Sequence, residues 1–115
     1  MTELFAYKLL TDDQWKGWKE SGIFTGAPVD LADGYIHLSA RDQARETAEK
    51  WFADTDPLIL VMVDLPALGD SVVWEPSRGG ALFPHAYGTI PMSAVAGHSK
   101  LRIGASGTHD WPAGF

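Results

Sequence analysis

A continuous apolar run at residues 58–63 limits the folds open to this chain more than any other feature. The run is too short for a typical helix and is rich in β-branched side chains, so we expect a strand. Because no polar residue interrupts it, this strand should be central and buried on both of its faces. A chain of 115 residues with 45% hydrophobic residues can bury such a strand inside one domain. We therefore predict a single domain spanning residues 1–115.

The N-terminal part of the chain predicts a strand followed by a helix. Residues 5–10 are mostly apolar, and Thr11 and Gln14 have the spacing of a capping box, which starts a helix after Thr11. Gly22 is a suitable residue to end this helix, since glycine readily adopts the left-handed conformation found there. The same helix carries two tryptophans on one face, both expected in the core: Trp15 and Trp18.

A second helix is predicted over residues 41–52, with Ser39 as its N-cap. The remaining segments are expected to form strands at 35–39, 72–75 and 99–103, irregular loops at 26–34 and 76–88, and a glycine-rich tail at 104–115. This order of strands and two main helices predicts a small α+β fold with a mostly antiparallel sheet.

The net charge of the chain disfavours some classes of binding partner. Nine Lys and Arg against 15 Asp and Glu give a net charge of -6, which repels the phosphate backbones of DNA and RNA. A small anionic ligand remains compatible, because one arginine or a helix terminus can hold it. No apolar run approaches the roughly 20 residues of a membrane span, and the first residues do not resemble a signal peptide. With no cysteine, thiolate chemistry is excluded, and we expect a cytoplasmic protein.

The segment after the strand at 72–75 groups an acid, a hydroxyl, a guanidinium and two glycines. Arg78 can bind a phosphate or a carboxylate through two parallel hydrogen bonds. Gly79 and Gly80 let the backbone approach a ligand closely and expose N–H groups to an anion. A glycine-rich turn without any ligand is an equally frequent use of such a sequence. The candidate residues of this motif are Glu75, Arg78, Gly79 and Gly80.

A second motif, residues 83–88, combines two aromatic rings with a histidine. Phe83 and Tyr87 could form walls for a flat ring, and His85 could exchange a proton near neutral pH. A loop that holds two aromatic residues and a histidine is a frequent pocket lining. The alternative is a turn shaped by Pro84 and Gly88, with both rings covering the core.

The strand at 35–39 supplies a third candidate. Period-two alternation places Ile36 and Leu38 on one face and Tyr35, His37 and Ser39 on the other. The polar face could bind a ligand through hydrogen bonds, although a single such histidine is more often structural.

A metal site is not expected from the histidine spacing. The four histidines stand at positions 37, 85, 98 and 109, with no short paired interval. A spatial site from His37, His85 and Glu75 is conceivable but disfavoured. Glycine motifs of dinucleotide-binding and P-loop proteins are absent, as is the Gly-x-Ser-x-Gly motif of many serine hydrolases.

Taken together, three motifs resemble the DUF952 family, a bacterial family without an assigned function. The resemblance covers about residues 5–95, and the motifs occur in the family's order. Ala40 stands where family members often have threonine, and Ala86 where most have a larger apolar residue. The motifs are Asp33-Gly34-Tyr35-Ile36-His37-Leu38-Ser39, Trp74-Glu75-Pro76-Ser77-Arg78-Gly79-Gly80 and Phe83-Pro84-His85-Ala86-Tyr87-Gly88.

The resemblance implies a fold of the ADP-ribosyltransferase type, with a bent, split sheet around a cleft for NAD or a related nucleotide. In such enzymes the histidine of a His-x-Thr or His-x-Ser pattern binds the nicotinamide-side ribose. His37 and Ser39 match this pattern. Glu75 or His85 would then be the catalytic candidate. Arg78, Gly79 and Gly80 would bind phosphate. Phe83 or Tyr87 would stack on a base, with Tyr35 beside them.

Three functions remain open at this stage. The first is an enzyme of ADP-ribosyl or glycosyl transfer, acting on a small molecule. The second is a ligand-binding module on the same fold without turnover, since fold does not imply function. The third is a protein-interaction domain, for which the five tryptophans could supply an exposed apolar patch.

Overall fold

The computed structural model describes residues 4–115, apart from the side chain of Arg78. The strands are β1 (Phe5–Thr11), β2 (Ile23–Phe24), β3 (Ile36–His37), β4 (Leu58–Asp64), β5 (Val72–Pro76), β6 (Leu82–Ala86), β7 (Ile90–Pro91) and β8 (Val95–Leu101). The helices are α1 (Asp12–Ser21), α2 (Pro28–Asp33) and α3 (Ala44–Trp51), with 3₁₀ turns at Pro66–Ser71, Arg78–Gly80 and Met92–Ala94.

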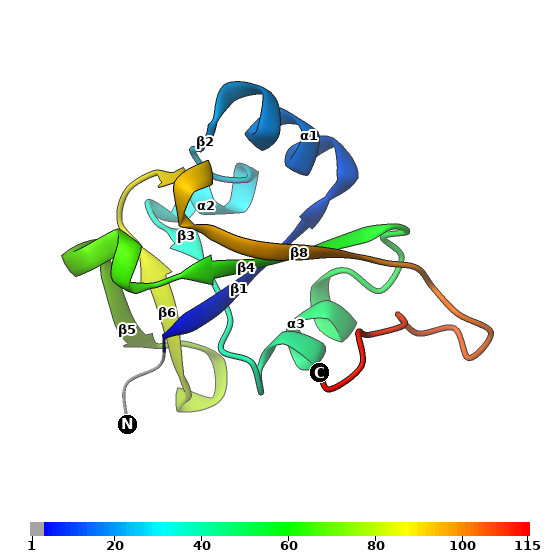
Figure 1. Cartoon of the computed structure of the whole chain (residues 1–115). Helices are drawn as coiled ribbons and strands as arrows, with labels where there is room; N and C mark the ends of the chain where they lie inside the picture. Colours follow the sequence, from blue (N-terminus) through cyan, green and yellow to red (C-terminus); the bar gives the residue numbers. More distant parts are fainter. Residues whose placement is uncertain (1–3) are drawn as a thin grey trace.

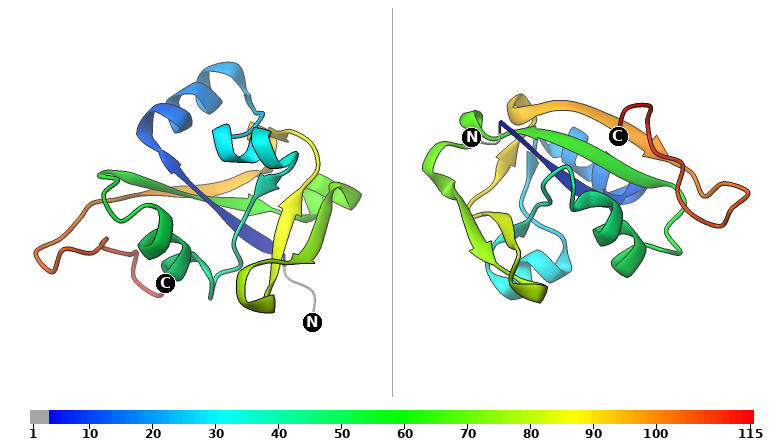
Figure 2. Two further views of the ribbon diagram at one scale, coloured as in Figure 1. Left: turned by 180° about the vertical axis from the view of Figure 1, so that it is seen from behind. Right: turned by 90° about the horizontal axis from the view of Figure 1, so that it is seen from below.

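The strands form three small antiparallel sheets rather than one. β4 is the central strand of the β1-β4-β8 sheet, β2 pairs with β7, and β6 is central in the β3-β6-β5 sheet. Figure 1 shows α1 on one side of the β1-β4-β8 sheet and α3 on the other, and Figure 2 gives the same arrangement from behind and from below. The predicted α+β class with a split, antiparallel sheet is therefore confirmed.

β4 is buried on both faces, as the unbroken apolar run predicts. Ile59, Val61 and Val63 point into one core cluster, which also holds Trp15 and Trp18. The alternate residues of β4 point into a second cluster on the α3 side of the sheet: Leu58 and Leu60, with Tyr7, Leu9, Ala48 and Leu101. The period of two along a strand thus divides one apolar run between two cores.

The predicted capping box at the start of α1 is confirmed. The Gln14 backbone N–H donates to Thr11 Oγ1 at 3.1 Å, and the Thr11 N–H donates to Gln14 Oε1 at 2.9 Å. Gly22 ends the helix with φ of 82°, in the left-handed region that favours glycine.

Two segments predicted as irregular contain regular structure. Residues 26–34 include α2, which begins at Pro28 and is capped by the Asp30 carboxylate, whose Oδ2 accepts from the Ala27 N–H at 2.8 Å. Residues 76–88 include β6, which pairs with β5 along its length and with β3 at its end. Both expectations were wrong: the strands that pair with β6 lie outside the local pattern, and the six residues of α2 are too few to show a helical apolar period.

The second helix is shorter than predicted, and Ser39 does not cap it. α3 begins at Ala44, after Gln43 as N-cap. Ser39 is instead paired with Tyr7 in an isolated antiparallel bridge, through N–H···O bonds of 2.8 Å in both directions. This bridge holds the chain after β3 against β1.

The C-terminal tail folds back over α3. The Trp111 and Phe115 rings stack with centroids 5.1 Å apart. Phe115 also lies edge-on to Tyr7, with centroids 5.0 Å apart. Arg41 donates to the Gly114 carbonyl, and Arg45 donates to the Phe115 carbonyl at 3.0 Å. No helix within residues 4–115 is long and apolar enough to cross a bilayer.

Candidate functional site

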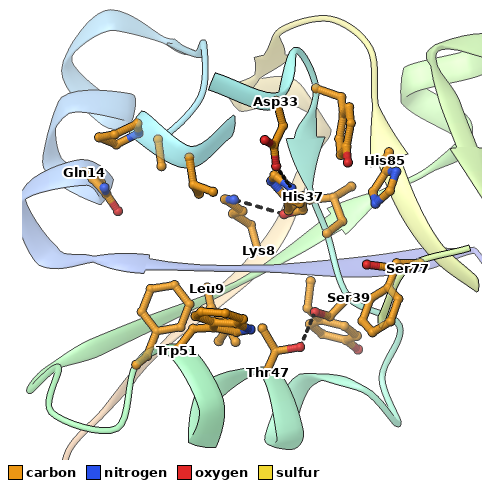
Figure 3. A pocket seen from close by; sticks show the side chains of 18 of the residues that line it. Lys8, Leu9, Gln14, Asp33, His37, Ser39, Thr47, Trp51, Ser77 and His85 are labelled. Atoms are coloured by element: carbon orange, nitrogen blue, oxygen red, sulfur yellow. Dashed lines mark hydrogen bonds and ion pairs between the residues drawn. The ribbon is translucent and has the colours of Figure 1, made fainter. Parts of the chain in front are cut away.

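A cavity of about 560 Å³ lies across β1, between α2 and β3 on one side and α3 on the other (Figure 3). Its volume falls within the range of roughly 300–1,000 Å³ that is typical of small-molecule sites. The residues that line it are Tyr7, Lys8, Leu9, Thr11, Gln14, Ala27, Pro28, Val29, Asp33, Tyr35, His37, Leu38, Ser39, Thr47, Trp51, Phe52, Ser77, Phe83 and His85.

One wall of the cavity is supported by a buried ion pair between β1 and α2. Lys8 Nζ lies 2.9 Å from Asp30 Oδ2, and the two side chains are only 5% and 1% exposed. The ammonium also donates to the His37 carbonyl at 3.0 Å. Burial lowers the pKa of the Lys8 amine, although the carboxylate of Asp30 opposes that shift. Burial would raise the pKa of Asp30, but hydrogen bonds from His37 and the charge of Lys8 outweigh it and lower that pKa.

His37 lies between two carboxylates. Its Nδ1 is 2.6 Å from Asp30 Oδ1, and its Nε2 is 2.9 Å from Asp33 Oδ2. Ionised carboxylates only accept hydrogen bonds, so both ring nitrogens donate when both bonds form. A ligand can reach His37 because its side chain is 32% exposed, but it must compete with Asp33 for Nε2.

A second histidine faces the cavity from β6 and is held by Glu75 of the neighbouring strand. His85 Nδ1 is 2.7 Å from Glu75 Oε1, and the Tyr87 hydroxyl donates to the same oxygen at 2.6 Å. These hydrogen bonds, Tyr87 first and His85 second, lower the pKa of Glu75. The Glu75 acceptor in turn raises the pKa of Tyr87 to about 12.

Tyr35 brings the two histidines into one aromatic cluster. Its ring stacks on His85 with centroids 4.1 Å apart and an angle of 25° between the planes. The same ring lies 4.8 Å from His37 and 5.3 Å from Tyr87. The result is an aromatic surface with polar edges, of the kind on which a ligand ring can stack.

The opposite side of the cavity is formed by α3. Ser39 Oγ and Thr47 Oγ1 lie 3.1 Å apart, and either hydroxyl can donate to the other. Trp51 is 61% exposed, which places a large ring at the margin of the cavity. Figure 3 shows Trp51 and His85 on opposite sides, with Lys8, His37 and Ser39 between them.

Most of the residues predicted for the site come together. The structure places Tyr35, His37, Ser39, Phe83 and His85 in the lining of the cavity. Glu75 and Tyr87 stand behind His85, hydrogen-bonded to it or to each other.

The glycine motif lies at the edge of this arrangement. Gly79 and Gly80 form the 3₁₀ turn Arg78–Gly80 and do not line the cavity. The Gly80 N–H donates to the Ser77 carbonyl at 2.9 Å, so this amide serves the turn. The Arg78 side chain lies outside the described residues, and the prediction that it binds phosphate stays a prediction. Ser77, which was not predicted, does line the cavity.

Sequence reasoning missed the carboxylates and the lysine around His37. A lone lysine in the apolar strand at residues 5–10 was the available signal for Lys8, because a buried lysine needs a buried acid as partner. Asp33 lies four residues before His37, but the helix ends between them at Gly34, so this spacing gave no signal. Thr47 and Trp51 gave no signal of their own, since their place at the cavity depends on how α3 packs across β1.

Comparison with known proteins places this fold among proteins of undefined activity. The model of the family DUF952, described as a protein of unknown function, matches residues 9–98. The crystal structure of protein CC0527 from Caulobacter crescentus is 45% identical, with a TM-score of 0.87 over 92% of this chain and 93% of that chain. The solution NMR structure of CC0527 is 46% identical, with a TM-score of 0.81 over 90% of each chain. A search of curated proteins gave no match.

Proposed function

The chain belongs to the DUF952 family, whose function is unknown, and we propose that its cavity binds a nucleotide-like small molecule of the NAD or ADP-ribose type. The observation that carries the proposal is the distribution of rings and polar groups around about 560 Å³. The Tyr35–His85 stack stands on one side and Trp51 on the other, with hydroxyl and imidazole groups between. A nucleotide combines the same features, because flat rings are joined by a hydroxyl-rich sugar.

Each candidate residue has a proposed role. His37 and Ser39 bind a ribose, for which His37 exchanges its Asp33 bond for a ribose hydroxyl. Phe83 or the Tyr35–His85 stack contacts a base, as aromatic side chains do in many nucleotide sites. Phosphate would lie near Ser77, which Arg78 and Gly79 follow directly in the chain. Support for the NAD type comes from the resemblance of His37-Leu38-Ser39 to the His-x-Ser pattern of ADP-ribosyltransferases.

Two forms of this function differ in whether a bond is broken. In the first, the protein transfers an ADP-ribosyl or glycosyl group, with Glu75 or His85 as the acid–base group. In the second, it binds the ligand without turnover. One observation favours the second form: the Glu75 carboxylate is engaged by His85 and Tyr87 and does not line the cavity.

The tryptophans give little support to a protein-interaction domain. Trp15 and Trp18 are buried, and Trp74 and Trp111 are half-buried. Trp51 is exposed, but it belongs to the margin of the cavity. Small-molecule binding is therefore the function that the arrangement supports best.

Titration calorimetry with NAD, ADP-ribose and nicotinamide tests the proposal. We expect binding of at least one of the two nucleotides, and weakening by about tenfold in Tyr35→Ala, because stacking is worth about 1–3 kcal/mol per base. Leu31→Ala is the matched control, since Leu31 is exposed on α2 and does not line the cavity. Nicotinamide released from NAD during the titration, followed by NMR, would identify the transferase form. The absence of binding by either nucleotide would contradict the proposal.

A further inference from the structure

The geometry points to Nε2 of His85 as a hydrogen-bond acceptor that selects ring ligands with an N–H donor, such as a carboxamide, over the same ring with a carboxylate. Glu75 is the positioning residue that fixes this state of His85. The inference rests on the proposed function in one respect, namely that the cavity receives a flat ring. It goes further by naming the chemical group that the ring must carry.

The proton of a neutral His85 is assigned by its neighbours. Glu75 Oε1 lies 2.7 Å from Nδ1 and accepts a second hydrogen bond from the Tyr87 hydroxyl. The pKa of Glu75 is lowered, so this group is a carboxylate with no proton to donate. Nδ1 must therefore be the donor, and the neutral ring carries its lone pair on Nε2.

The lone pair is available to a ligand. Among the described residues, His85 makes its hydrogen bond through Nδ1, and none is formed by Nε2. The side chain is only 4% exposed, yet it lines the cavity, into which Figure 3 shows the ring projecting from β6. A nearly buried acceptor without a partner favours a ligand that supplies the missing donor, because leaving it unpaired is costly.

The surroundings of His85 restrict how that donor arrives. Tyr35 covers one face of the imidazole at 4.1 Å, so a ligand reaches Nε2 along the edge of the ring. A carboxamide lies in the plane of its aromatic ring and can donate from that direction. A carboxylate in the same position would bring a negative oxygen against the lone pair, with Asp33 and Glu75 adding like charge nearby.

His37 cannot make the same selection. When both of its carboxylate contacts are hydrogen bonds, its two nitrogens donate, to Asp30 on one side and to Asp33 on the other. It therefore offers a donor, and only after Asp33 is displaced. His37 thus offers a donor and His85 an acceptor, so His85 is the residue that selects a carboxamide over a carboxylate.

The first test needs no ligand. Nitrogen-15 NMR of the imidazoles in the free protein, at a pH where His85 is neutral, reports which nitrogen carries the proton. We expect the Nδ1–H form in the natural protein and in Tyr87→Phe, which keeps the Glu75–His85 contact. The Nε2–H form in the natural protein would overturn the inference.

The second test uses two probes of equal shape, nicotinamide and nicotinate. We expect nicotinamide to bind at least about tenfold more tightly, the effect of one buried hydrogen bond. In His85→Asn the amide N–H can still donate to Glu75 but no acceptor remains at the Nε2 position, so the preference should disappear. Tyr87→Phe should retain it.

The outcomes separate this inference from the proposed function. Equal affinities in the natural protein, tighter binding of nicotinate, or no binding of either ring would overturn the selection by His85. Calorimetry with NAD and ADP-ribose decides the proposed function independently. A protein that binds ADP-ribose but neither ring would keep the proposed function and lose the inference.

Discussion

The Asp30 carboxylate and the Lys8 ammonium, 2.9 Å apart and almost shielded from water, join α2 to β1 beneath the cavity. The same carboxylate accepts hydrogen bonds from the backbone N–H groups of Ala27 at 2.8 Å and His37 at 3.0 Å. It also accepts from the His37 ring. One side chain therefore fixes the start of α2, the strand β3 and the His37 ring in position relative to one another.

Replacing Asp30 should destabilise the fold strongly. Asp30→Ala leaves Lys8 buried without its counter-charge, and removing one partner of a buried pair costs about 3–5 kcal/mol. Urea unfolding followed by circular dichroism measures the loss. Lys16→Ala is the control, because it breaks the exposed Lys16–Asp12 pair of 3.2 Å and should cost about 1 kcal/mol or less. Equal losses in the two variants would contradict the role given to Asp30.

Acid should weaken the protein through the same residue. The pKa of folded Asp30 lies below its ordinary value of 3.8, so the unfolded chain takes up a proton first as the pH falls. The stabilisation from Asp30 is therefore complete above about pH 5 and declines as the pH falls through 3.8 and below. Urea unfolding at several pH values should show the advantage of the natural protein over Asp30→Asn shrinking on acidification. A constant difference would refute this linkage.

Two glycines of the first helix should respond to alanine with opposite signs. Gly22 has φ of 82°, and an added Cβ would meet no atom within 4 Å, so Gly22→Ala carries only the backbone cost of about 1 kcal/mol. Gly17 lies inside α1, also with open space around it, so Gly17→Ala should stabilise by about 0.5–1 kcal/mol. Thermal melts of both variants check the prediction, which fails if the two shifts have the same sign.

Tyr87 should titrate well above 10.0, the ordinary pKa of a tyrosine. Its hydroxyl donates to the Glu75 carboxylate, which stabilises the neutral phenol and raises its pKa to about 12. The phenolate absorbance of the natural protein minus that of Tyr87→Phe isolates this residue. In Glu75→Gln the negative charge is gone, and the pKa should move back toward 10.0. An unchanged titration in Glu75→Gln would show that Glu75 does not control the phenol.

Local signals in the sequence predicted the parts of the fold that depend on neighbours along the chain. The Thr11–Gln14 capping box and the Gly22 terminus involve residues within one turn of helix, so their spacing alone defines them. The central strand β4 was predictable because an apolar run has to be covered on both faces. Of the parts that were missed, β6 depends on partners distant in sequence, namely the β5 residues that pair with it. α2 has local signals at its ends, Pro28 and Gly34, but its six residues are too few to show a helical apolar period.

In the candidate site, too, local features were predictable and long-range contacts were not. The sequence predicted His37 and His85 as separate candidates, and their closeness, with centroids 5.7 Å apart, follows from the pairing of β3 with β6. Lys8 and Asp30 were missed as a pair because they lie 22 positions apart, although the lone lysine in an apolar strand was a local signal for Lys8. The pairing of β5 with β6 also brings Glu75 to His85 Nδ1, a contact that no spacing in the sequence indicates.

A two-dimensional amide NMR titration of the labelled protein with NAD tests the central proposal most directly. We predict that the largest shifts fall on residues around the cavity: Tyr35, His37, Ser39, Thr47 and His85. Amides of the distant strand β8 should stay in place and serve as the internal control. Shifts confined to β8 or the C-terminal tail, or no shifts at millimolar NAD and ADP-ribose, would contradict the assignment of this cavity as a nucleotide site.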